Sequence, residues 1–214
     1  MEGKLIVFEG VEGSGKTTQL ERLREWLQRM LNFGDSPPVV VTREPGGTKL
    51  GLELRKLLLS NTSGTIQDSA ELLLYTADRA QHVEEVLKPQ LAMGAIILCD
   101  RYTDSTSAYQ GYGRGLSHNK IHQLNSIATG GLESDLTLWL DIDVEVSLAR
   151  KRSGGVADRI EQADCSFHRR VQQGYIELAL SHPHRIVRVD ASLSEEAVQE
   201  QIQAILSQRL SQWY

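Results

Sequence analysis

Short runs of apolar residues, many of them β-branched, recur along the chain and predict buried strands. The runs cover Leu5–Phe8, Val39–Thr42, Ala95–Cys99, Leu136–Leu140 and Ile186–Val189. Their hydrophobicity is continuous rather than alternating, which is typical of strands covered on both faces, and such strands belong to parallel sheets. The pattern therefore predicts a parallel sheet that lies between two layers of helices.

Between these runs, apolar residues recur with helical spacing. The clearest sets are Leu20, Leu23, Leu27 and Leu31, and later Val198, Ile202, Ile205 and Leu206. Because strand and helix alternate throughout, we expect an α/β fold of three layers with about five parallel strands and right-handed crossovers, whose ligands bind beyond the carboxyl ends of the strands. No linker divides the chain, so we expect a single domain over residues 1–214.

Composition and charge narrow the classes of function. The chain has 214 residues, 40% of them hydrophobic, and a net charge of −5, which argues against a protein that coats nucleic acid. Cys99 and Cys165 lie far apart without CxxC spacing, which disfavours a disulfide framework and a zinc site. No apolar run is long enough for a membrane span or a signal peptide, so we expect a cytoplasmic protein without a membrane partner.

The strongest local signal is the sequence GVEGSGKT at residues 10–17, which satisfies the P-loop pattern GxxxxGK(S/T) between the first expected strand and helix. Its glycines let successive backbone N–H groups point at phosphate oxygens, at the positive end of a helix. Lys16 adds a mobile positive charge, and the Thr17 hydroxyl can bind Mg²⁺. The alternative is a glycine-rich turn that only caps the helix. The candidate nucleoside triphosphate site comprises Gly10, Val11, Glu12, Gly13, Ser14, Gly15, Lys16 and Thr17.

The third expected strand ends in Asp100-Arg101, which places a carboxylate and a guanidinium at the same sheet edge as the P-loop. Asp100 can orient a water of Mg²⁺, and Arg101 can bridge phosphates, as phosphoryl transfer requires. A salt bridge at the strand end is the alternative. The chain lacks the NKxD-type segment with which GTPase switches read guanine, since Leu124-Asn125-Ser126 has neither the Lys nor the Asp.

Further residues suit a nucleobase with a phosphate attached. Tyr75 and Arg79 are four positions apart on an expected helix, which places the ring and the guanidinium on one face. Arg55 follows the loop at residues 43–48 by two to three helical turns and can face a second phosphate. Taken alone, Tyr75 also fits a core position.

Residues 150–170 hold six Lys or Arg against three acids, a balance of +3 within a chain of −5. Gly154-Gly155 provide a flexible break, so the stretch can act as a lid whose arginines close over a triphosphate and exclude water. The alternative is a solvated basic helix end.

Together these motifs resemble, from end to end, those of bacterial thymidylate kinases, a family of P-loop nucleoside monophosphate kinases. The matching segments are FEGVEGSGKTT at residues 8–18, TREPGGT at 42–48, DRY at 100–102 with Ser105, AYQG at 108–111, SDLT at 134–137 and DRIE at 158–161. Related nucleotide kinases lack the REPGG loop and the DRY…AYQG run. The resemblance implies a three-layer P-loop kinase fold with a central parallel sheet and a short lid at about residues 150–160.

The resemblance also implies a reaction: transfer of the γ-phosphoryl group of ATP to the 5′-phosphate of dTMP, giving dTDP and ADP, with Mg²⁺ as cofactor. This is a step of dTTP biosynthesis. By the same analogy we expect a cytoplasmic homodimer, in which Leu72, Leu73 and Leu87 either pair subunits or fill the core.

Residue roles carried over from the family fall into four groups: dTMP binding, ATP binding, metal binding and catalysis. Tyr75 stands where the family usually has a Phe that stacks on thymine. Arg79 stands where the family has an Arg that reaches a carbonyl of the base, and Tyr109 would pack against the sugar near its 2′ position. The implied dTMP site comprises Glu9, Glu44, Arg55, Tyr75, Arg79, Arg101, Ser105, Tyr109 and Gln110. Arg150 joins the P-loop at ATP, Thr17 and Asp100 hold the metal, and the catalytic set is Glu12, Lys16, Arg101 and Arg152.

Glu12 in place of an Arg resembles the bacterial type, in which the lid supplies the catalytic positive charge. Which of Arg150, Lys151, Arg152 and Arg159 does so stays open. Because a lid residue acts on the transferring group, we expect Arg152→Ala to lower kcat more than it raises the KM for dTMP. Two other functions also stay open: a kinase of another nucleoside monophosphate, and a P-loop binding or switch protein with slow hydrolysis.

Overall fold

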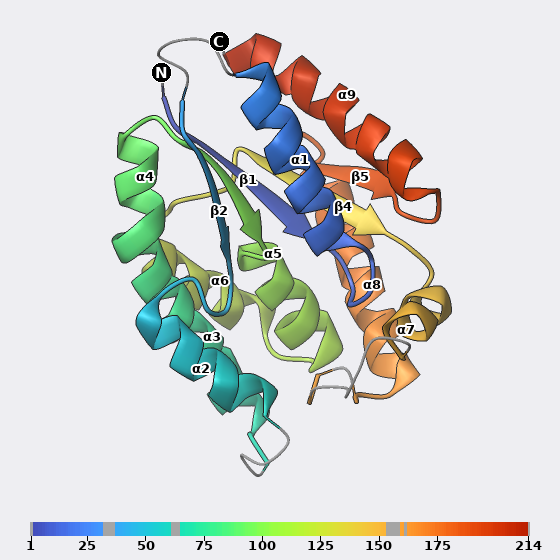
Figure 1. Ribbon diagram of the computed structural model, residues 1–214. Helices are drawn as coiled ribbons and strands as arrows, with labels where there is room; N and C mark the ends of the chain where they lie inside the picture. Colours follow the sequence, from blue (N-terminus) through green and yellow to red (C-terminus); the bar gives the residue numbers. More distant parts are fainter. Residues whose placement is uncertain (1, 32–36, 61–64, 153–158, 161, 214) are drawn as a thin grey trace.

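The strands form a parallel sheet. The structure, a computed structural model, describes residues 2–31, 37–60, 65–152, 159–160 and 162–213, without the side chains of residues 151 and 152. The strands in this part of the chain are β1 Lys4–Glu9, β2 Val39–Arg43, β3 Ile96–Asp100, β4 Leu136–Asp141 and β5 Ile186–Asp190. They lie in the order β2-β3-β1-β4-β5 and all neighbours are parallel (Figure 1). Every run that predicts a strand is a strand, which confirms the parallel α/β fold.

The segments between the strands are largely helical. Their bounds are α1 Lys16–Met30, α2 Lys49–Leu59, α3 Asp68–His82, α4 Lys88–Ala92, α5 Thr103–Thr106, α6 His118–Thr129, α7 Val144–Arg152, α8 Cys165–Ser181 and α9 Glu195–Trp213. A π-helical segment η1, Val83–Leu87, joins α3 to α4, and another, η2, Ser107–Gly113, continues α5. Of the periodic leucines, Leu20, Leu23 and Leu27 lie on α1 and Leu31 directly follows it. The later periodic set lies on α9, as predicted.

Helices cover both faces of the sheet. Side chains of β1 alternate between the faces: Leu5 and Val7 share an apolar cluster with η1, whereas Ile6 and Phe8 share one with α1 and α9. All four are fully buried, as expected of a strand at the centre of a sheet. Figure 1 shows α1 and α9 side by side on one side of the sheet, with α3 and α4 on the other. The three-layer prediction is therefore confirmed.

The register of the strands positions the site. Arg43 at the end of β2 and Phe8 near the end of β1 both pair with Asp100 at the end of β3. The P-loop follows β1, the REPGG loop follows β2, and Arg101 follows β3. These segments are far apart in the sequence, yet the sheet brings them to one edge.

The sequence leaves open whether three leucines fill the core or pair subunits, and the structure places them differently. Leu72 and Leu87 are buried and fill the core, whereas Leu73 on α3 is 55% exposed. In the described ranges, no helix combines the length and the apolar character that crossing a membrane requires.

Candidate active site

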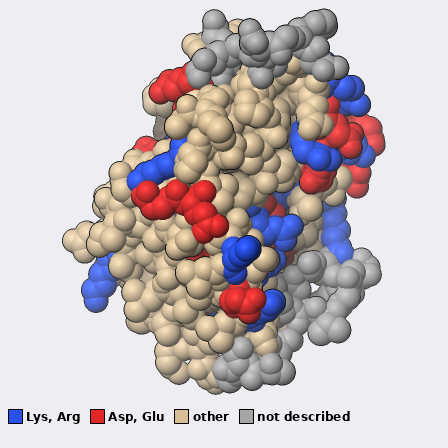
Figure 2. Space-filling view, turned by 60° about the vertical axis from the view of Figure 1, so that its left-hand side comes forward, with Lys and Arg blue, Asp and Glu red and all other residues tan. Residues whose placement is uncertain are grey.

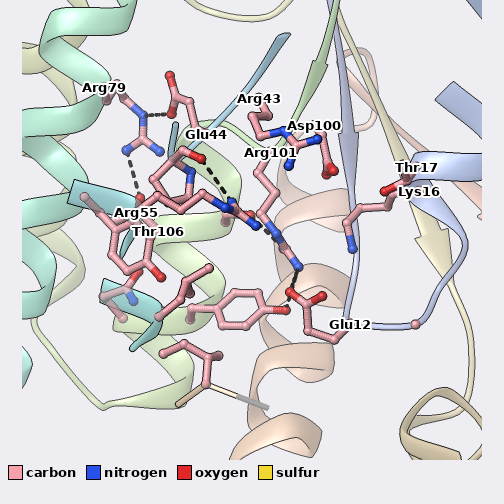
Figure 3. Close-up of a pocket in the computed structure, with 18 of the residues that line it drawn as sticks. Glu12, Lys16, Thr17, Arg43, Glu44, Arg55, Arg79, Asp100, Arg101 and Thr106 are labelled. Atoms are coloured by element: carbon pink, nitrogen blue, oxygen red, sulfur yellow. Dashed lines mark hydrogen bonds and ion pairs between the residues drawn. The ribbon is translucent and has the colours of Figure 1, made fainter. Parts of the chain in front are cut away.

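A cavity of about 450 Å³ lies beyond the carboxyl ends of β1, β2 and β3. Figure 3 shows Lys16 on one side of it, Arg79 on the other, and Arg101 between them. On the surface, blue Lys and Arg side chains lie recessed in a hollow (Figure 2). The predicted residues that line the cavity are Glu12, Gly13, Gly15, Lys16, Thr17, Glu44, Arg55, Tyr75, Arg79, Asp100, Arg101, Ser105, Tyr109, Gln110 and Arg150.

The P-loop has the conformation of an anion cradle. Gly13 and Gly15 have positive φ values of 75° and 90°, and a Cβ on Gly13 would lie 2.5 Å from the carbonyl oxygen of Ser147. Gly15 directly precedes α1, whose unpaired N–H groups and dipole favour an anion. The buried Ser14 Oγ has no hydrogen-bond partner among the described residues. The sequence thus needs glycine where the loop turns most tightly.

Lys16 lies folded against its own loop. Its buried Nζ donates to the carbonyl oxygens of Gly10 at 3.1 Å and Val11 at 2.9 Å. Burial and the nearby positive charge of Arg101 lower the pKa of Lys16. A polyphosphate in the cradle would provide negative charge at this position and favour the protonated form.

Arg101 crosses the centre of the cavity. Its φ of 72° lies in the left-handed region, which costs a non-glycine residue about 1–3 kcal/mol and is found most often at functional sites. Its guanidinium donates to the Gly10 carbonyl oxygen at 3.0 Å, Ser105 Oγ at 3.1 Å and Tyr109 Oη at 3.2 Å. It also forms an ion pair with Glu12 and lies 4.9 Å from the centre of the Tyr109 ring. Arg101 thus joins the P-loop to η2.

Asp100 and Thr17, the predicted metal ligands, both line the cavity. The Asp100 Oδ1 is buried, and it has no hydrogen-bond partner in the described part of the chain. Buried carboxylate oxygens are normally bonded, so this atom fits a role as acceptor for a bound ion or for its water.

Arg79 lies at the opposite end of the cavity from Lys16 (Figure 3). Tyr75, which is also on α3, and Gln110, which bonds to Glu71 on α3, line the same cavity. Tyr75 and Arg79 follow one another by one turn of α3, as the spacing predicts. Tyr109 and Gln110 are consecutive in the π-helical segment η2; such segments are rare and occur frequently at functional sites. The sequence motif AYQG marks this segment but does not reveal its wider helical turn.

Arg79 is held rigidly by buried acceptors. Its guanidinium donates to Glu44 Oε2, Thr106 Oγ1 and the Tyr102 carbonyl oxygen at 2.8 Å each, and to Asn125 Oδ1 at 2.7 Å. The side chain is 2% exposed. Such a fixed guanidinium can read a ligand group without losing conformational entropy when the ligand binds.

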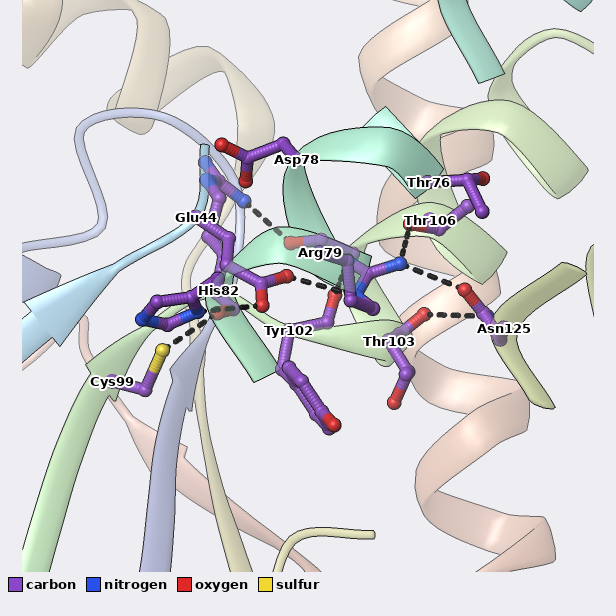
Figure 4. Close-up of polar contacts among 12 residues, drawn as sticks. Glu44, Thr76, Asp78, Arg79, His82, Cys99, Tyr102, Thr103, Thr106 and Asn125 are labelled. Atoms are coloured by element: carbon purple, nitrogen blue, oxygen red, sulfur yellow. Dashed lines mark hydrogen bonds and ion pairs between the residues drawn. The ribbon is translucent and has the colours of Figure 1, made fainter. Parts of the chain in front are cut away.

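A polar network behind Arg79 fixes the REPGG loop (Figure 4). The second oxygen of Glu44, Oε1, lies 2.9 Å from His82 Nδ1, and His82 Nε2 lies 2.6 Å from Thr42 Oγ1. Asp78 Oδ1 accepts a hydrogen bond from the Gly46 backbone N–H at 3.0 Å. Burial, followed by the charge of Glu44, raises the pKa of Asp78 to about 6. Glu44 and Asp78 therefore tie the loop after β2 to α3.

Glu9 lies beneath the cavity rather than on its surface. Its carboxylate accepts hydrogen bonds from the backbone N–H groups of Tyr102 at 2.9 Å and Ser105 at 3.0 Å, and from Tyr175 Oη at 2.7 Å. It also accepts from Ser105 Oγ at 2.5 Å. Burial and the Asp104 charge raise the pKa of Glu9. In this arrangement Glu9 positions Ser105 and the segment that follows Arg101.

A family model for thymidylate kinase matches residues 8–202, a span that includes every motif described above. The chain belongs to the thymidylate kinase family. Thymidylate kinases from Nostoc punctiforme and a further Nostoc species are 67% and 63% identical to it over 208 and 215 residues, covering 96% and 100% of both chains. A crystal structure of thymidylate kinase from Ehrlichia chaffeensis superposes with a TM-score of 0.79 at 33% identity, covering 96% of this chain and 100% of that one. The implied P-loop kinase fold is confirmed.

The lid expected of a thymidylate kinase falls largely outside the described residues. The side chain of Arg152, predicted to be catalytic, lies outside them, as does the Gly154-Gly155 break. Arg150 lines the cavity. Arg159 instead forms an ion pair with Glu71 on α3, with 2.5 Å between Nη2 and Oε2. The arginines of the basic stretch therefore have different surroundings: Arg150 lines the cavity, whereas Arg159 pairs with a residue of α3.

Several cavity residues lie within or beside the thymidylate kinase motifs but were not among the predicted site residues. Thr106 directly follows Ser105 and accepts a hydrogen bond from Arg79, and Arg43 begins the REPGG segment. Adjacency to a predicted residue was the available signal for both. The full set is Thr18, Arg43, Pro45, Thr106 and Ile160, together with Leu59 at the end of α2, which lies in none of the motifs. Conversely, Glu9, Gly10, Val11 and Ser14 do not line the cavity.

Proposed function

We propose that the chain phosphorylates dTMP to dTDP, with ATP on the P-loop and dTMP at the end formed by Tyr75, Arg79 and Gln110. The observation that carries the proposal is a single cavity in which Arg101 lies between the P-loop and this second end. A binding or switch protein that holds one nucleotide on its P-loop does not require a site for a second substrate. The reaction is in-line transfer of the γ-phosphoryl group to the 5′-phosphate.

Phosphoryl transfer depends on positioning and on stabilisation of negative charge. Lys16 exchanges the carbonyl oxygens of its own loop for phosphate oxygens of ATP. Arg101 exchanges Glu12 for phosphate oxygens, to which its planar guanidinium can donate two parallel hydrogen bonds. Glu12 holds Arg101 in place until the substrates arrive. Arg152 adds a further cation from the lid when the lid closes, and Arg150 assists at ATP.

At the other end, Arg55 lies near the 5′-phosphate, with Nη1 3.0 Å from the Pro45 carbonyl oxygen. Tyr75 stacks on the base, and Arg79 donates to a base carbonyl. Tyr109 packs against the sugar, where it disfavours a 2′-hydroxyl. The residues that position these groups are Glu9, Glu44 and Ser105.

Mg²⁺ fits the residues present. Thr17 provides a hydroxyl, and Asp100 provides the buried oxygen described above that lacks a partner among the described residues. Mg²⁺ in such sites is held by one or two protein oxygens together with waters and substrate phosphates. When bound, Mg²⁺ would neutralise negative charge on the phosphates of ATP. Thr17 and Asp100 would orient Mg²⁺ or the waters bound to it. Binding of Mg²⁺ therefore does not require a cluster of carboxylates.

A coupled assay of ADP release with MgATP and a panel of nucleoside monophosphates tests the proposal. We expect dTMP to accelerate ADP release far above the basal ATPase rate and above the other monophosphates. Equal acceleration by another monophosphate would assign the site to that nucleotide. No acceleration by any of them would contradict a kinase function.

The assembly and location follow the family analogy. Leu50, Leu57, Leu73 and Ile127 are exposed apolar side chains on α2, α3 and α6, and burying such side chains between subunits is favourable. We infer a cytoplasmic homodimer of single-domain subunits. Light scattering on the purified protein tests the dimer, and a monomer at micromolar concentration would contradict it.

A further inference from the structure

Glu71 on α3 is fully buried next to the cavity and holds the side chain of Gln110. Gln110 Nε2 donates to Glu71 Oε1 at 2.8 Å. Arg114 and Arg159 form ion pairs with the other oxygen, Oε2, at 3.2 and 2.5 Å. Neither the P-loop nor any motif of the sequence points to Glu71.

The two arginines keep Glu71 ionised. Burial by itself raises the pKa of Glu71, but the hydrogen bonds from Gln110, Arg114 and Arg159 and the charge of Arg114 outweigh it, so the pKa lies below its ordinary value. An ionised carboxylate accepts hydrogen bonds and donates none.

This ionisation determines which way the Gln110 amide faces. An amide has an NH₂ group that donates and an oxygen that accepts, and Glu71 can pair only with the NH₂ group. The Gln110 Oε1 is thereby left for the cavity, which Gln110 lines although it is 2% exposed. Among the described residues, the donation to Glu71 is the one hydrogen bond found for the Gln110 side chain.

Arg79 also lines the cavity, and it provides a hydrogen-bond donor where Gln110 Oε1 provides an acceptor. A guanidinium has five N–H donors and no acceptor, and in Arg79 four of them bond to Glu44, Thr106, Asn125 and Tyr102, leaving one on Nη2 among the contacts described. A ring that bonds to both side chains offers a carbonyl to Arg79 and an N–H to Gln110. Thymine and uracil have these groups side by side, whereas cytosine has them reversed, with an acceptor nitrogen and an amino group.

We propose that Glu71 is a positioning residue that selects the base: by fixing the Gln110 amide, it admits bases with a protonated ring nitrogen and rejects cytosine. The proposal rests on the proposed function and names how its base end discriminates. Arg114 and Arg159 act through Glu71, because they hold it in the charged form that Gln110 requires.

The test compares kcat/KM for dTMP and dCMP in the wild type and in Glu71→Gln. A glutamine at position 71 can donate as well as accept, so the Gln110 amide is free to turn and offer its NH₂ group to cytosine. Leaving a buried polar group mismatched changes an equilibrium by about tenfold or more, so we expect the dTMP-to-dCMP ratio to fall by about tenfold. The ratio is measured within one sample and does not depend on the fraction of folded enzyme.

Asp68→Asn is the matched control, because Asp68 also faces Arg114, at 3.6 Å, but does not contact Gln110. Its ratio should equal that of the wild type. Glu71→Asp, which keeps the charge but withdraws it from Gln110, is the second variant should Glu71→Gln fold poorly, and its ratio should also fall. A wild-type ratio in the Glu71 variants overturns the inference. Failure of the wild type to use dTMP overturns the proposed function instead.

Discussion

Arg79 Nε and Glu44 Oε2 are 2.8 Å apart in an ion pair whose two side chains are each 2% exposed. The pair joins α3, which carries Arg79, to the loop after β2, which carries Glu44. Burying two charges has a large desolvation cost, which the attraction between them offsets, so removing either side chain would leave the other charge buried without compensation. The same contact that holds the fold together here therefore also fixes the guanidinium that faces the cavity.

Replacing Arg79 with leucine should destabilise the protein strongly. Glu44 would stay buried without its main partner of opposite charge, and removing one member of a buried pair costs about 3–5 kcal/mol. Urea unfolding followed by circular dichroism measures the change in the free energy of unfolding. The control is Arg22→Gln, which removes a surface pair with Glu195 in which the side chains are 35% and 62% exposed. It should cost less than about 1 kcal/mol; equal losses in the two variants would contradict the prediction.

Lys16→Ala should lower kcat by about a hundredfold or more, because it removes a positive charge from the transferring phosphates at the transition state. The protein should stay folded, since in the structure Lys16 bonds only to carbonyl oxygens of its own loop among the described contacts. Steady-state kinetics with saturating ATP and dTMP measures the effect. Lys56→Ala, at a side chain that is 71% exposed, is the control and should leave kcat unchanged. Near wild-type turnover of Lys16→Ala would remove Lys16 from the mechanism.

Most of the fold and much of the candidate site could be predicted from local sequence. Continuous apolar runs identify the strands because burial on both faces demands them, and the P-loop is recognisable because its glycines are required by geometry. Arg101 and Gln110 were found because they belong to contiguous motifs.

Glu71 could not be predicted in the same way. Its role depends on Gln110, Arg114 and Arg159, which lie 39, 43 and 88 positions further along the chain, and no spacing rule connects them. Its carboxylate also falls on a helix where an acidic residue near the start is favoured anyway. Arg150 lines the cavity and Arg159 pairs with Glu71, and this difference likewise arises from tertiary contacts that the sequence does not reveal.

That division predicts that the two arginines affect the KM values of different substrates. Arg150 lines the cavity with the P-loop residues, so Arg150→Ala should raise the KM for ATP by about tenfold or more, as the loss of one hydrogen bond to a charged group does. Arg159→Ala weakens the support of Glu71 and should raise the KM for dTMP by a similar factor. Initial rates with each substrate varied in turn separate the effects, and the two variants serve as controls for one another. The same substrate affected in both would show that the basic stretch acts as one unit.

The pKa of Asp78 makes a prediction about stability and pH. It is raised from its ordinary value of 3.8 to about 6, first by burial and then by the charge of Glu44. Between these values the folded protein holds a proton that the unfolded chain has released, so this group makes the protein less stable as the pH rises from about 4 to 6. The full loss is about 3 kcal/mol, from the pKa difference at about 1.4 kcal/mol for each unit.

Asp78→Asn removes this dependence while its amide oxygen can still accept the hydrogen bond from Gly46. The variant should match the wild type at about pH 4 and exceed its free energy of unfolding above about pH 6.5. Glu44 and His82, the titratable neighbours, are present in both proteins, so the difference between the two urea unfolding curves at each pH isolates Asp78. A difference that does not grow between these pH values would mean that Asp78 is ionised in the folded protein at low pH, stabilised by Gly46 and Arg79 more than it is destabilised by burial.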